Sequence, residues 1–591
     1  MSEEHPETEK YTNMFHPEFV PGTINLLLER VDEEHVGKSH LKTTKDGIIL
    51  HPQPTDNPND PLNWGKWTKL YQFFLLAFIT GFTAATSNNA SAVQESMNEV
   101  YSISYDSMNT GAGVLFVSIA LTTVFLGPTS YLCGRKISYI ICVAMGLAGL
   151  AWFANATRTA DTIWSQLFVG SSEACAEATV QLSIADMYYS HQLSWALTIY
   201  IIATSVGTYL GPLIAGFIVD ADYTWVGYAG LIISCVLLLV VLFTQYETYF
   251  DRLSYSQVEG KRARLGNESP TDSTAKETID KESTNDLEAT QSNKRNTVAV
   301  LTTFTATADV VDGTVHSGWK AFFLGNSIQL EKKSYLQNIS LLTPSNNLKG
   351  FGFKQYIHRL FAMLRVFWFP PVLYSGLQWG LQDAFLTFYL TTEDNDYYDP
   401  PFNYSNHAVA LMNIPCVIGA VMGCCYAGVL SDKFVRYLAK RRGGVQEAED
   451  YLWFLFALMP ICPIGLVVFA CGTDNNYKWP IIYIFGLGFL GFSFGCAGDI
   501  AMAYLMAAYP EMVLEGMIAV ACINNFIGCI FTFACSPWLE RMSNAHTYAI
   551  LAALQFAALL FNVPLIMYGK KIRMWTKKYY VSYVEERDKR I

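Results

Sequence analysis

Positive charge is missing from four long, apolar stretches of this 591-residue chain. Charged residues make up 15% of the sequence and hydrophobic residues 51%, whereas soluble domains carry about 25% charged residues. This excludes an ordinary soluble domain, and the net charge of −11 gives no reason to expect nucleic-acid binding. The stretches without Lys or Arg are Leu70–Gly134, Thr159–Asp251, Val366–Asp432 and Trp479–Glu540.

The patterns of enzymes and metal sites are also missing. The 13 cysteines lie in or beside apolar segments, with no CxxC or Cys/His ligand spacing, so we predict that they pack in the interior, without metal or disulfides. No H-E-x-x-H, G-x-S-x-G or P-loop pattern occurs. We therefore expect neither an enzyme nor a resident cofactor.

Twelve segments are long and apolar enough to cross a membrane as helices, which need about 20 residues each. They predict an all-α membrane protein with two six-helix bundles, at 66–250 and 366–569. The polar stretch 251–365 between them is expected to be largely disordered, although the aromatic patch around Trp319, Phe322 and Phe323 could dock on a bundle. The segments are 68–90, 109–131, 137–156, 162–185, 194–218, 224–246, 367–391, 406–430, 451–471, 480–507, 515–537 and 546–568.

Basic residues gather in alternate loops and predict the orientation. The positive-inside rule places these loops in the cytosol, together with the polar tail 1–65, the central loop 251–365 and the C-terminal tail 570–591. The first 65 residues contain no short apolar core that would indicate a cleavable signal. The basic loop residues are Lys66, Lys69, Arg135, Lys136, Lys433, Arg436, Lys440, Arg441, Arg442, Lys570, Lys571, Arg573, Lys577 and Lys578.

Several carboxylates lie inside the apolar segments. An Asp at a bilayer centre costs about 2.5 to 3.5 kcal/mol, so such acids are expected to face an internal cavity. Glu173 and Glu177 are four residues apart and share one helix face; Asp383 and Asp499 lie in the second half. Acids in both halves are what a site between two bundles needs, and a polar helix contact is the alternative for each. No His lies mid-segment, so Glu177 and Asp499 are the candidates for carrying a proton.

Aromatic and amide side chains accompany these acids. Trp379, Tyr389 and Tyr504 share helices with the acids and offer ring faces to a cation, although only Trp379, four residues before Asp383, lies on the same helix face as an acid. Asn88 in the first segment, and Asn524 with Asn525 in the eleventh, are polar groups at depth. They could bind substrate or hydrogen-bond between helices.

The loop Gly127–Lys136 resembles the cytosolic G-x-x-x-D-x-x-G-R-K signature of the major facilitator superfamily, and Gly428–Lys433 repeats its first part. Tyr131 occupies the usual Asp position, so this loop must be held differently. The motif Gly207-x-x-x-Gly211-Pro-x-x-x-Gly216 resembles that of the drug:proton antiporter branch, and close helix packing explains it equally well. The resemblance implies two bundles that work by alternating access.

Longer runs are similar to the polyamine-importing fungal members of this superfamily. The stretch Gln53–Trp64 resembles the sequence that precedes the first span in fungal members of the branch; the other runs are Ala84–Asn88, Ile103–Val114, Asp161–Gly170, Asp383–Thr392 and Gly498–Met506. The resemblance implies a monomeric plasma-membrane importer of spermidine, spermine, putrescine and related organic cations. Its other partners would be membrane lipid and protons.

Gate residues and rival functions remain to be weighed. A salt bridge between Arg135 and Asp186 would form a conformational latch, with Asp432 as the equivalent in the second half, while Glu511 and Glu515 are expected to cap a helix start.

Proton symport and potential-driven uniport both stay open, since a trivalent cation gains about 7 kcal/mol across 100 mV. The main rival is a drug:proton antiporter that exports amphipathic cations. A nutrient sensor is disfavoured by the short C-terminal tail.

Overall fold

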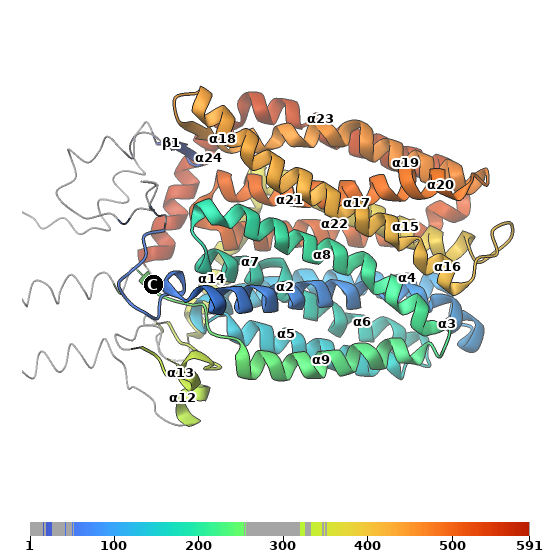
Figure 1. Cartoon of the computed structure of the whole chain (residues 1–591), viewed down its shortest axis with the longest axis horizontal. Coiled ribbons are helices and arrows are strands. Elements are labelled where there is room, and N and C mark those ends of the chain that lie inside the picture. The colour runs from blue at the N-terminus through green and yellow to red at the C-terminus, as the bar shows by residue number, and fades with distance from the viewer. Residues whose placement is uncertain are drawn as a thin grey trace, which may run out of the picture.

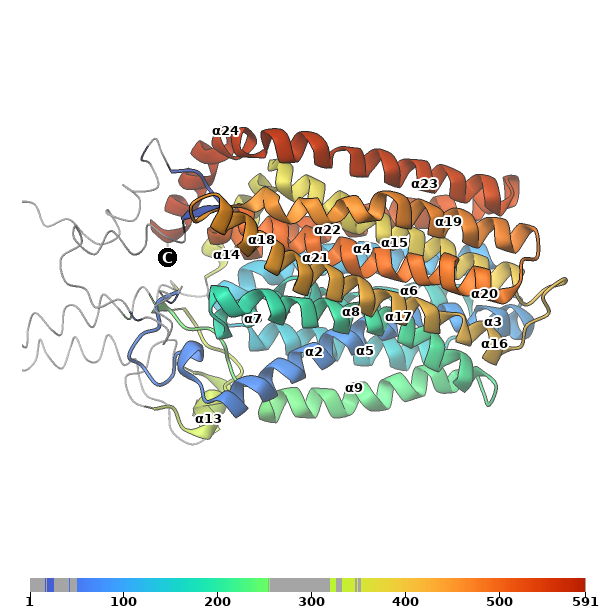
Figure 2. The ribbon, with the colours of Figure 1, turned by 45° about the horizontal axis from the view of Figure 1, so that its top comes forward.

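The computed structural model describes residues 52–252 and 352–589, together with residues 16, 19–25, 42, 50, 255, 319–325, 332–345 and 348. Over these residues the chain is almost wholly helical, and its long helices run side by side along one axis (Figures 1 and 2). The helices coincide with the apolar runs that the sequence predicts.

The first half contains six long helical segments. They are α2 (Lys66–Asn88), α4 (Tyr105–Leu132), α5 (Lys136–Ala154), α6 (Thr159–Ala174) with its continuation, α8 (Ser190–Val219) and α9 (Thr224–Thr244). The chain continues from α6 through a π-helical segment η5 (Cys175–Val180) into α7 (Gln181–Met187), and a short helix α3 (Gln94–Tyr101) precedes α4. The Ser104 side chain caps α4 by accepting a hydrogen bond from Ser107 N.

The second half repeats this pattern. Its first helix is α15 (Pro370–Asp396), and the second segment consists of α16 (Asn406–Leu411), α17 (Asn413–Cys425), the π-helical η7 (Tyr426–Leu430) and α18 (Ser431–Arg441). The third is η8 (Ala448–Ala457) with α19 (Leu458–Asp474), and the fourth is α20 (Trp479–Ile481) with η9 (Ile482–Leu487) and α21 (Gly488–Ala508). The helices η10 (Pro510–Met512) with α22 (Val513–Arg541), α23 (Asn544–Leu560) and α24 (Asn562–Lys589) complete the second half. Before all of these helices, α14 (Phe353–Leu364) and η6 (Arg365–Trp368) meet α15 at an 82° bend.

Each of the twelve predicted segments overlaps a helix, which confirms the all-α membrane fold. In the described part of the chain, 10 helices are long and apolar enough to cross a membrane, or 11 with the bent pair. The segment α6–η5–α7 is less apolar because Glu173, Glu177 and several serines interrupt it. It nevertheless packs against α4 and α5 like its neighbours.

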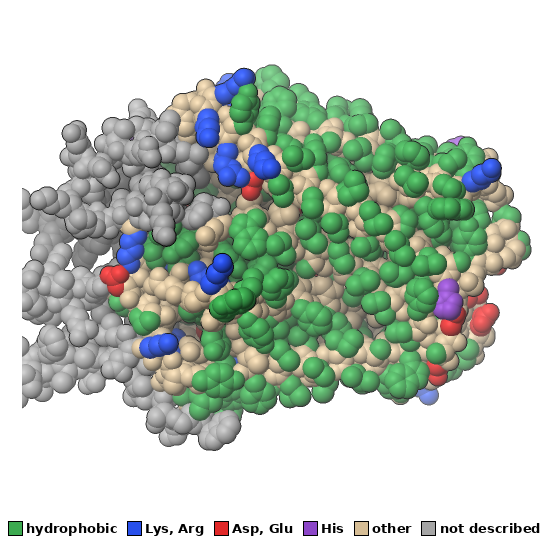
Figure 3. Space-filling model, viewed as in Figure 1, with side chains coloured by type: hydrophobic (Ala, Val, Ile, Leu, Met, Phe, Trp, Pro, Cys, Tyr) green, Lys and Arg blue, Asp and Glu red, His purple; other side chains and the backbone are tan. Residues whose placement is uncertain are grey.

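Side chains on the surface have the distribution of a membrane protein (Figure 3). Large apolar side chains such as Phe78, Ile232 and Phe526 are exposed along the flanks of the helices. Lys and Arg gather at one end, which we call the basic end. It holds the connection between α4 and α5, the helix α18 and the last part of α24. The other end, with α3 and α16, is called the opposite end.

Described segments from near the two ends of the sequence meet at the basic end. The strand β1 (Thr23–Asn25) pairs antiparallel with β2 (Val445–Glu447). Arg573 of α24 is fully buried there and forms ion pairs of 2.7 Å with Glu447 and 2.6 Å with Glu449. The described part of the predicted tail 570–591 belongs to the helix α24. Arg573 connects this helix to the strand pair.

Part of the predicted central loop also packs on the first bundle. Phe322 in α12 (Trp319–Phe323) stacks on Phe243, with ring centroids 6.2 Å apart, as the aromatic patch predicted. The Lys136 ammonium donates to the Ile339 carbonyl over 2.7 Å. Most of the remaining residues of 251–365 lie outside the described residues, so the disorder predicted for this loop stays a prediction. Most of the predicted tail 1–65 also lies outside the described residues.

Candidate functional site

Three carboxylates face one another where the two bundles meet. Glu173 of α6 and Glu177 of η5 come from the first bundle, and Asp383 of α15 from the second; Asp383 interacts electrostatically with both. None of them forms an ion pair with a basic side chain in the described part of the chain. Glu177 lies within the π-helical segment Cys175–Val180, a feature that often marks functional sites. We call Glu173, Glu177 and Asp383 the central acids.

Polar groups from neighbouring helices accompany the central acids. Ser87 of α2 interacts with Glu173, and Asn524 of α22 interacts with Glu177 across the bundle interface. The Asn524 Nδ2 atom is buried without a well-aligned acceptor among the described residues. Tyr200 of α8 also lies close to Glu177. The site therefore combines hydrogen-bond donors with carboxylates that have no basic partner within the described part of the chain.

Three aromatic rings form a row beside Asp383. The Trp379 and Phe494 ring centroids are 5.7 Å apart, and Phe494 lies 5.7 Å from Tyr209. Tyr209 interacts electrostatically with Asp383, and its buried hydroxyl has no partner in the described part of the chain. Trp379 was predicted from its helical spacing. Phe494 and Tyr209 were missed, and the position of Tyr209 inside the glycine motif of α8 was the available signal.

Asp499 lies at a second contact between the bundles. Its Oδ2 atom accepts a hydrogen bond of 3.1 Å from Thr198 Oγ1 on α8, and only 4% of the residue is exposed. The Trp379 ring packs directly on Gly498, where a Cβ atom would collide with it. Trp379 is one helical turn before Asp383, so a residue of the central site contacts the helix position next to Asp499.

The structure places three predicted site residues elsewhere. Tyr504 lies near Arg573 at the basic end. Tyr389 donates to Asn413 Oδ1 over 3.2 Å on the side of the opposite end, and Asn88 bonds a carbonyl of its own helix. Separations of five and six residues turn a side chain away from the face of its acid, which explains why the two tyrosines point to other neighbours.

The predicted latch exists as an ion pair within one bundle. Arg135 Nε lies 3.3 Å from Asp186 Oδ2, and both residues belong to the first bundle. Burial lowers the pKa of Arg135, but the Asp186 and Glu247 carboxylates outweigh this and raise it. Asp432, by contrast, interacts with Ser194 of the other bundle. The gating roles of these residues stay predictions.

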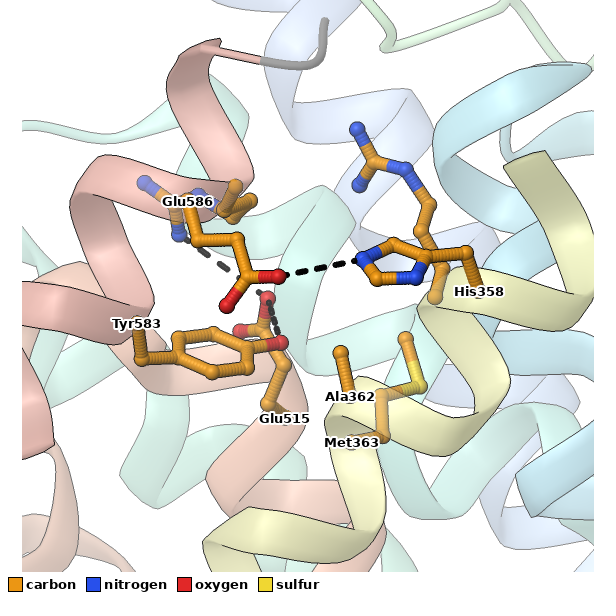
Figure 4. Close-up of a pocket in the computed structure, with 8 residues that line it drawn as sticks. His358, Ala362, Met363, Glu515, Tyr583 and Glu586 are labelled. Carbon is orange, nitrogen blue, oxygen red and sulfur yellow. Dashed lines mark hydrogen bonds and ion pairs between the residues drawn. The ribbon is translucent and has the colours of Figure 1, made fainter.

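Tyr131, at the unusual position of the loop motif, reaches the other bundle. Its hydroxyl donates a long hydrogen bond of 3.4 Å to Glu515 Oε1, which also accepts one of 3.3 Å from Tyr583. Glu515 is 1% exposed, so it ties three segments together rather than simply capping α22. It lines a small pocket with His358, Arg359, Ala362, Met363, Tyr583, Glu586 and Arg587 (Figure 4).

Contacts between the bundles also close the opposite end. Asn109 Nδ2 donates to Ser536 Oγ over 2.8 Å, and Asn406 Nδ2 donates to Asp220 Oδ1 over 2.7 Å. Together with the Tyr131 and Thr198 contacts, these bonds link the two bundles toward both ends of the molecule.

Comparison with known proteins gives a consistent result. The chain matches the Major Facilitator Superfamily profile over residues 73–533. It is 48% identical to Protein HOL1 of Saccharomyces cerevisiae, over 98% of this chain and 100% of that protein. An uncharacterised transporter of the superfamily from Schizosaccharomyces pombe is 43% identical, over 97% of this chain and 96% of its own.

A solved proton:xylose symporter, XylE, has a similar fold. The TM-score is 0.51 at 13% sequence identity, over 85% of this chain and 97% of XylE. At this identity the likeness concerns the fold alone. The profile match and the two similar fungal proteins, however, cover most of the chain. The protein therefore belongs to the Major Facilitator Superfamily and is a multi-pass membrane transporter.

Proposed function

We propose that this transporter imports polyamines such as spermidine, spermine and putrescine, and related organic cations, by alternating access. The observation that carries the proposal is the set of three carboxylates from both bundles that have no basic partner among the described residues. Spermidine and spermine carry several ammonium groups along an apolar chain, so they can neutralise separated acids at once. The aromatic row beside Asp383 suits the methylene segments and offers cation–π contacts.

Bridging of the bundles gives a physical reason for occlusion. Without a cation, the negative charges of Glu177 and Asp383 repel each other across the interface. A multivalent cation between them reverses this repulsion and favours the state in which the bundles are closed around it. A carboxylate that takes up a proton loses its repulsion in the same way, so proton binding and cargo binding are linked.

Glu177 and Asp499 are the proposed proton carriers. Glu177 belongs to the central acids, whereas Asp499 accepts a hydrogen bond from Thr198 at the contact between the bundles. Protonation of Asp499 would change that contact and could thereby couple a proton to movement of the bundles. The membrane potential alone can also drive cation import, at about 2.3 kcal/mol per charge for 100 mV. Uptake by itself therefore does not show proton symport, which needs its own test with a proton gradient.

The basic end is assigned to the cytosol. Lys and Arg gather there (Figure 3), and the positive-inside rule favours the cytosolic side for such loops. Both termini then lie in the cytosol, and the opposite end faces the cell exterior. We further propose a monomer in the plasma membrane.

Export of amphipathic drugs by proton antiport is the second candidate. The glycine motif of α8, which resembles that branch, favours it. Gly207 and Gly211, however, pack directly on the backbone of Gly81 and Ala85 in α2. Close helix packing therefore accounts for the motif without antiport, and import remains our preferred direction.

The test is uptake by purified protein in liposomes. We expect saturable uptake of radiolabelled spermidine under an inside-negative potential, and an inward proton gradient should accelerate it if the cation is a symport substrate. The Asp383→Asn variant should lose most uptake, whereas Asp106→Asn, at an exposed position in the first turn of α4, serves as the control. Folded protein that takes up no polyamine but expels cationic drugs would move the assignment to the antiporter.

A further inference from the structure

A second acidic pocket lies between the bundles at the opposite end. Glu393 and Asp394 at the end of α15 line it and are only 3% and 6% exposed. The Glu393 Oε2 and Asp394 Oδ2 atoms are buried without a hydrogen-bond partner among the described residues. An isolated charge away from water is costly, so buried carboxylate oxygens of this kind are satisfied by a cationic ligand, by water or by a proton.

The surrounding hydrogen bonds hold one of these acids in place. Asn413 Nδ2 donates to Glu393 Oε1 over 3.1 Å, and the Asn413 amide oxygen in turn accepts from Tyr389 over 3.2 Å. The Tyr389 side chain also interacts with the Glu393 carboxylate, so among the described residues Asp394 Oδ2 is the oxygen that stays open for a ligand. This network also gives Tyr389 a role that its sequence position did not suggest.

Acids of both bundles gather around this pocket. Tyr398, which lines it, interacts electrostatically with Asp394, Glu393, Glu95 and Asp220. Glu95 belongs to α3 and Asp220 follows α8, so two of the four acids come from the first bundle. Figure 3 shows acidic side chains at this end of the molecule.

The surroundings favour an organic ammonium group over a metal ion. No group of three or more His, Cys, Asp or Glu side chains in the described part of the chain could hold a metal. The pocket wall contains Pro212, Gly216, Val409 and Ala410, which suit methylene groups, and Tyr398 offers a ring face. A primary ammonium on an alkyl chain matches the chemistry of both the acidic and the apolar residues of this wall.

Helix geometry connects this pocket with the central acids. Asp394 follows Asp383 by 11 residues on α15, which is about three turns and about 16 Å along the same helix face. We propose that the pocket is an outer binding site for a primary ammonium group, which bridges acids of both bundles and helps to close the outer end. That this ammonium group belongs to the transported polyamine rests on the proposed function.

The first experiment measures spermidine uptake kinetics in liposomes with the outer end exposed. We expect Asp394→Asn to raise KM about tenfold, about 1.4 kcal/mol, while kcat stays within about twofold. Asp106→Asn, an exposed acid at the same end, is the matched control and should change neither value. Unchanged KM in the folded Asp394→Asn variant, or a loss of kcat alone, would overturn the proposal. Glu393→Gln replaces Asp394→Asn if the latter fails to fold.

A second measurement separates this inference from the proposed function. Butylammonium chloride, which has a single ammonium group, should raise the thermal unfolding temperature of the wild type and of Asp383→Asn, but not of Asp394→Asn. If the wild type transports no spermidine, the proposed function fails and this measurement still decides the pocket. An equal shift in all three proteins, or none in the wild type, would contradict an outer ammonium site.

Discussion

Replacement of Arg573 by Met should destabilise the protein strongly. Arg573 is 0% exposed and bonds Glu447 and Glu449, which are themselves mostly buried. It also donates to the Pro21 carbonyl and, over 3.2 Å, to Thr23 Oγ1. Removal of one partner from a buried ion pair leaves uncompensated charge and costs about 3 to 5 kcal/mol. The same change should release the strand that contains Thr23.

The assay is thermal or denaturant unfolding in detergent, followed by tryptophan fluorescence, with limited proteolysis of the N-terminal segment. Arg573→Lys should recover only part of the loss, because one ammonium cannot bond two carboxylates with a planar fork. Lys578→Met, an exposed position on the same helix, is the control. A loss below about 1 kcal/mol in Arg573→Met, the range of exposed pairs, would refute the reasoning.

Three further predictions concern the basic end and the aromatic row. Tyr131→Phe should weaken the contact between the bundles at Glu515 by about 1 kcal/mol, the typical contribution of one hydrogen bond. Amide hydrogen exchange near Glu515 should then rise about fivefold. Gly498→Ala should displace the Trp379 ring and cost about 1 to 3 kcal/mol through overpacking, with weaker spermidine binding. Burial raises the pKa of Glu447, but hydrogen bonds from neighbouring groups outweigh burial and lower it. The ionised Glu447 therefore stabilises the folded protein above about pH 4.3, and this stabilisation is lost on further acidification. Faster proteolysis of the N-terminal segment at low pH should report the loss.

Each of these predictions has a control. Tyr437→Phe changes an exposed tyrosine at the basic end, and Gly65→Ala adds a methyl group where nothing lies within 4 Å. Unchanged exchange in Tyr131→Phe, or wild-type stability and binding in Gly498→Ala, would show that these contacts are unimportant. For Glu447, Glu447→Gln should remove the effect of acidification on proteolysis, and its persistence would point to another group.

The helices could be predicted because a membrane span carries its own signal. Twenty consecutive apolar residues must form a helix in lipid, where backbone groups have no water to bond. The fourth segment was identified by its length although it contains two glutamates. The end of α15 was placed too early, at residue 391, so Glu393 and Asp394 were left out of the expected site although the helix continues to Asp396.

Partners across the bundle interface could not be predicted. A helix that is apolar all round does not reveal which face meets another helix. Nothing in the sequence links Tyr131 to Glu515 or Thr198 to Asp499, which are 384 and 301 residues apart. The chemistry of the central acids followed from their cost in a membrane, but their aromatic row with Tyr209 needed the three-dimensional arrangement.

The central claim is that carboxylates of both bundles form one site for a multivalent cation. We would measure binding of putrescine, spermidine and spermine to the purified protein by calorimetry, for the wild type and for Asp383→Asn. The account predicts affinity that rises with the number of ammonium groups, and a loss in Asp383→Asn that is larger for spermine than for putrescine. Equal binding of all three amines by both proteins would contradict it.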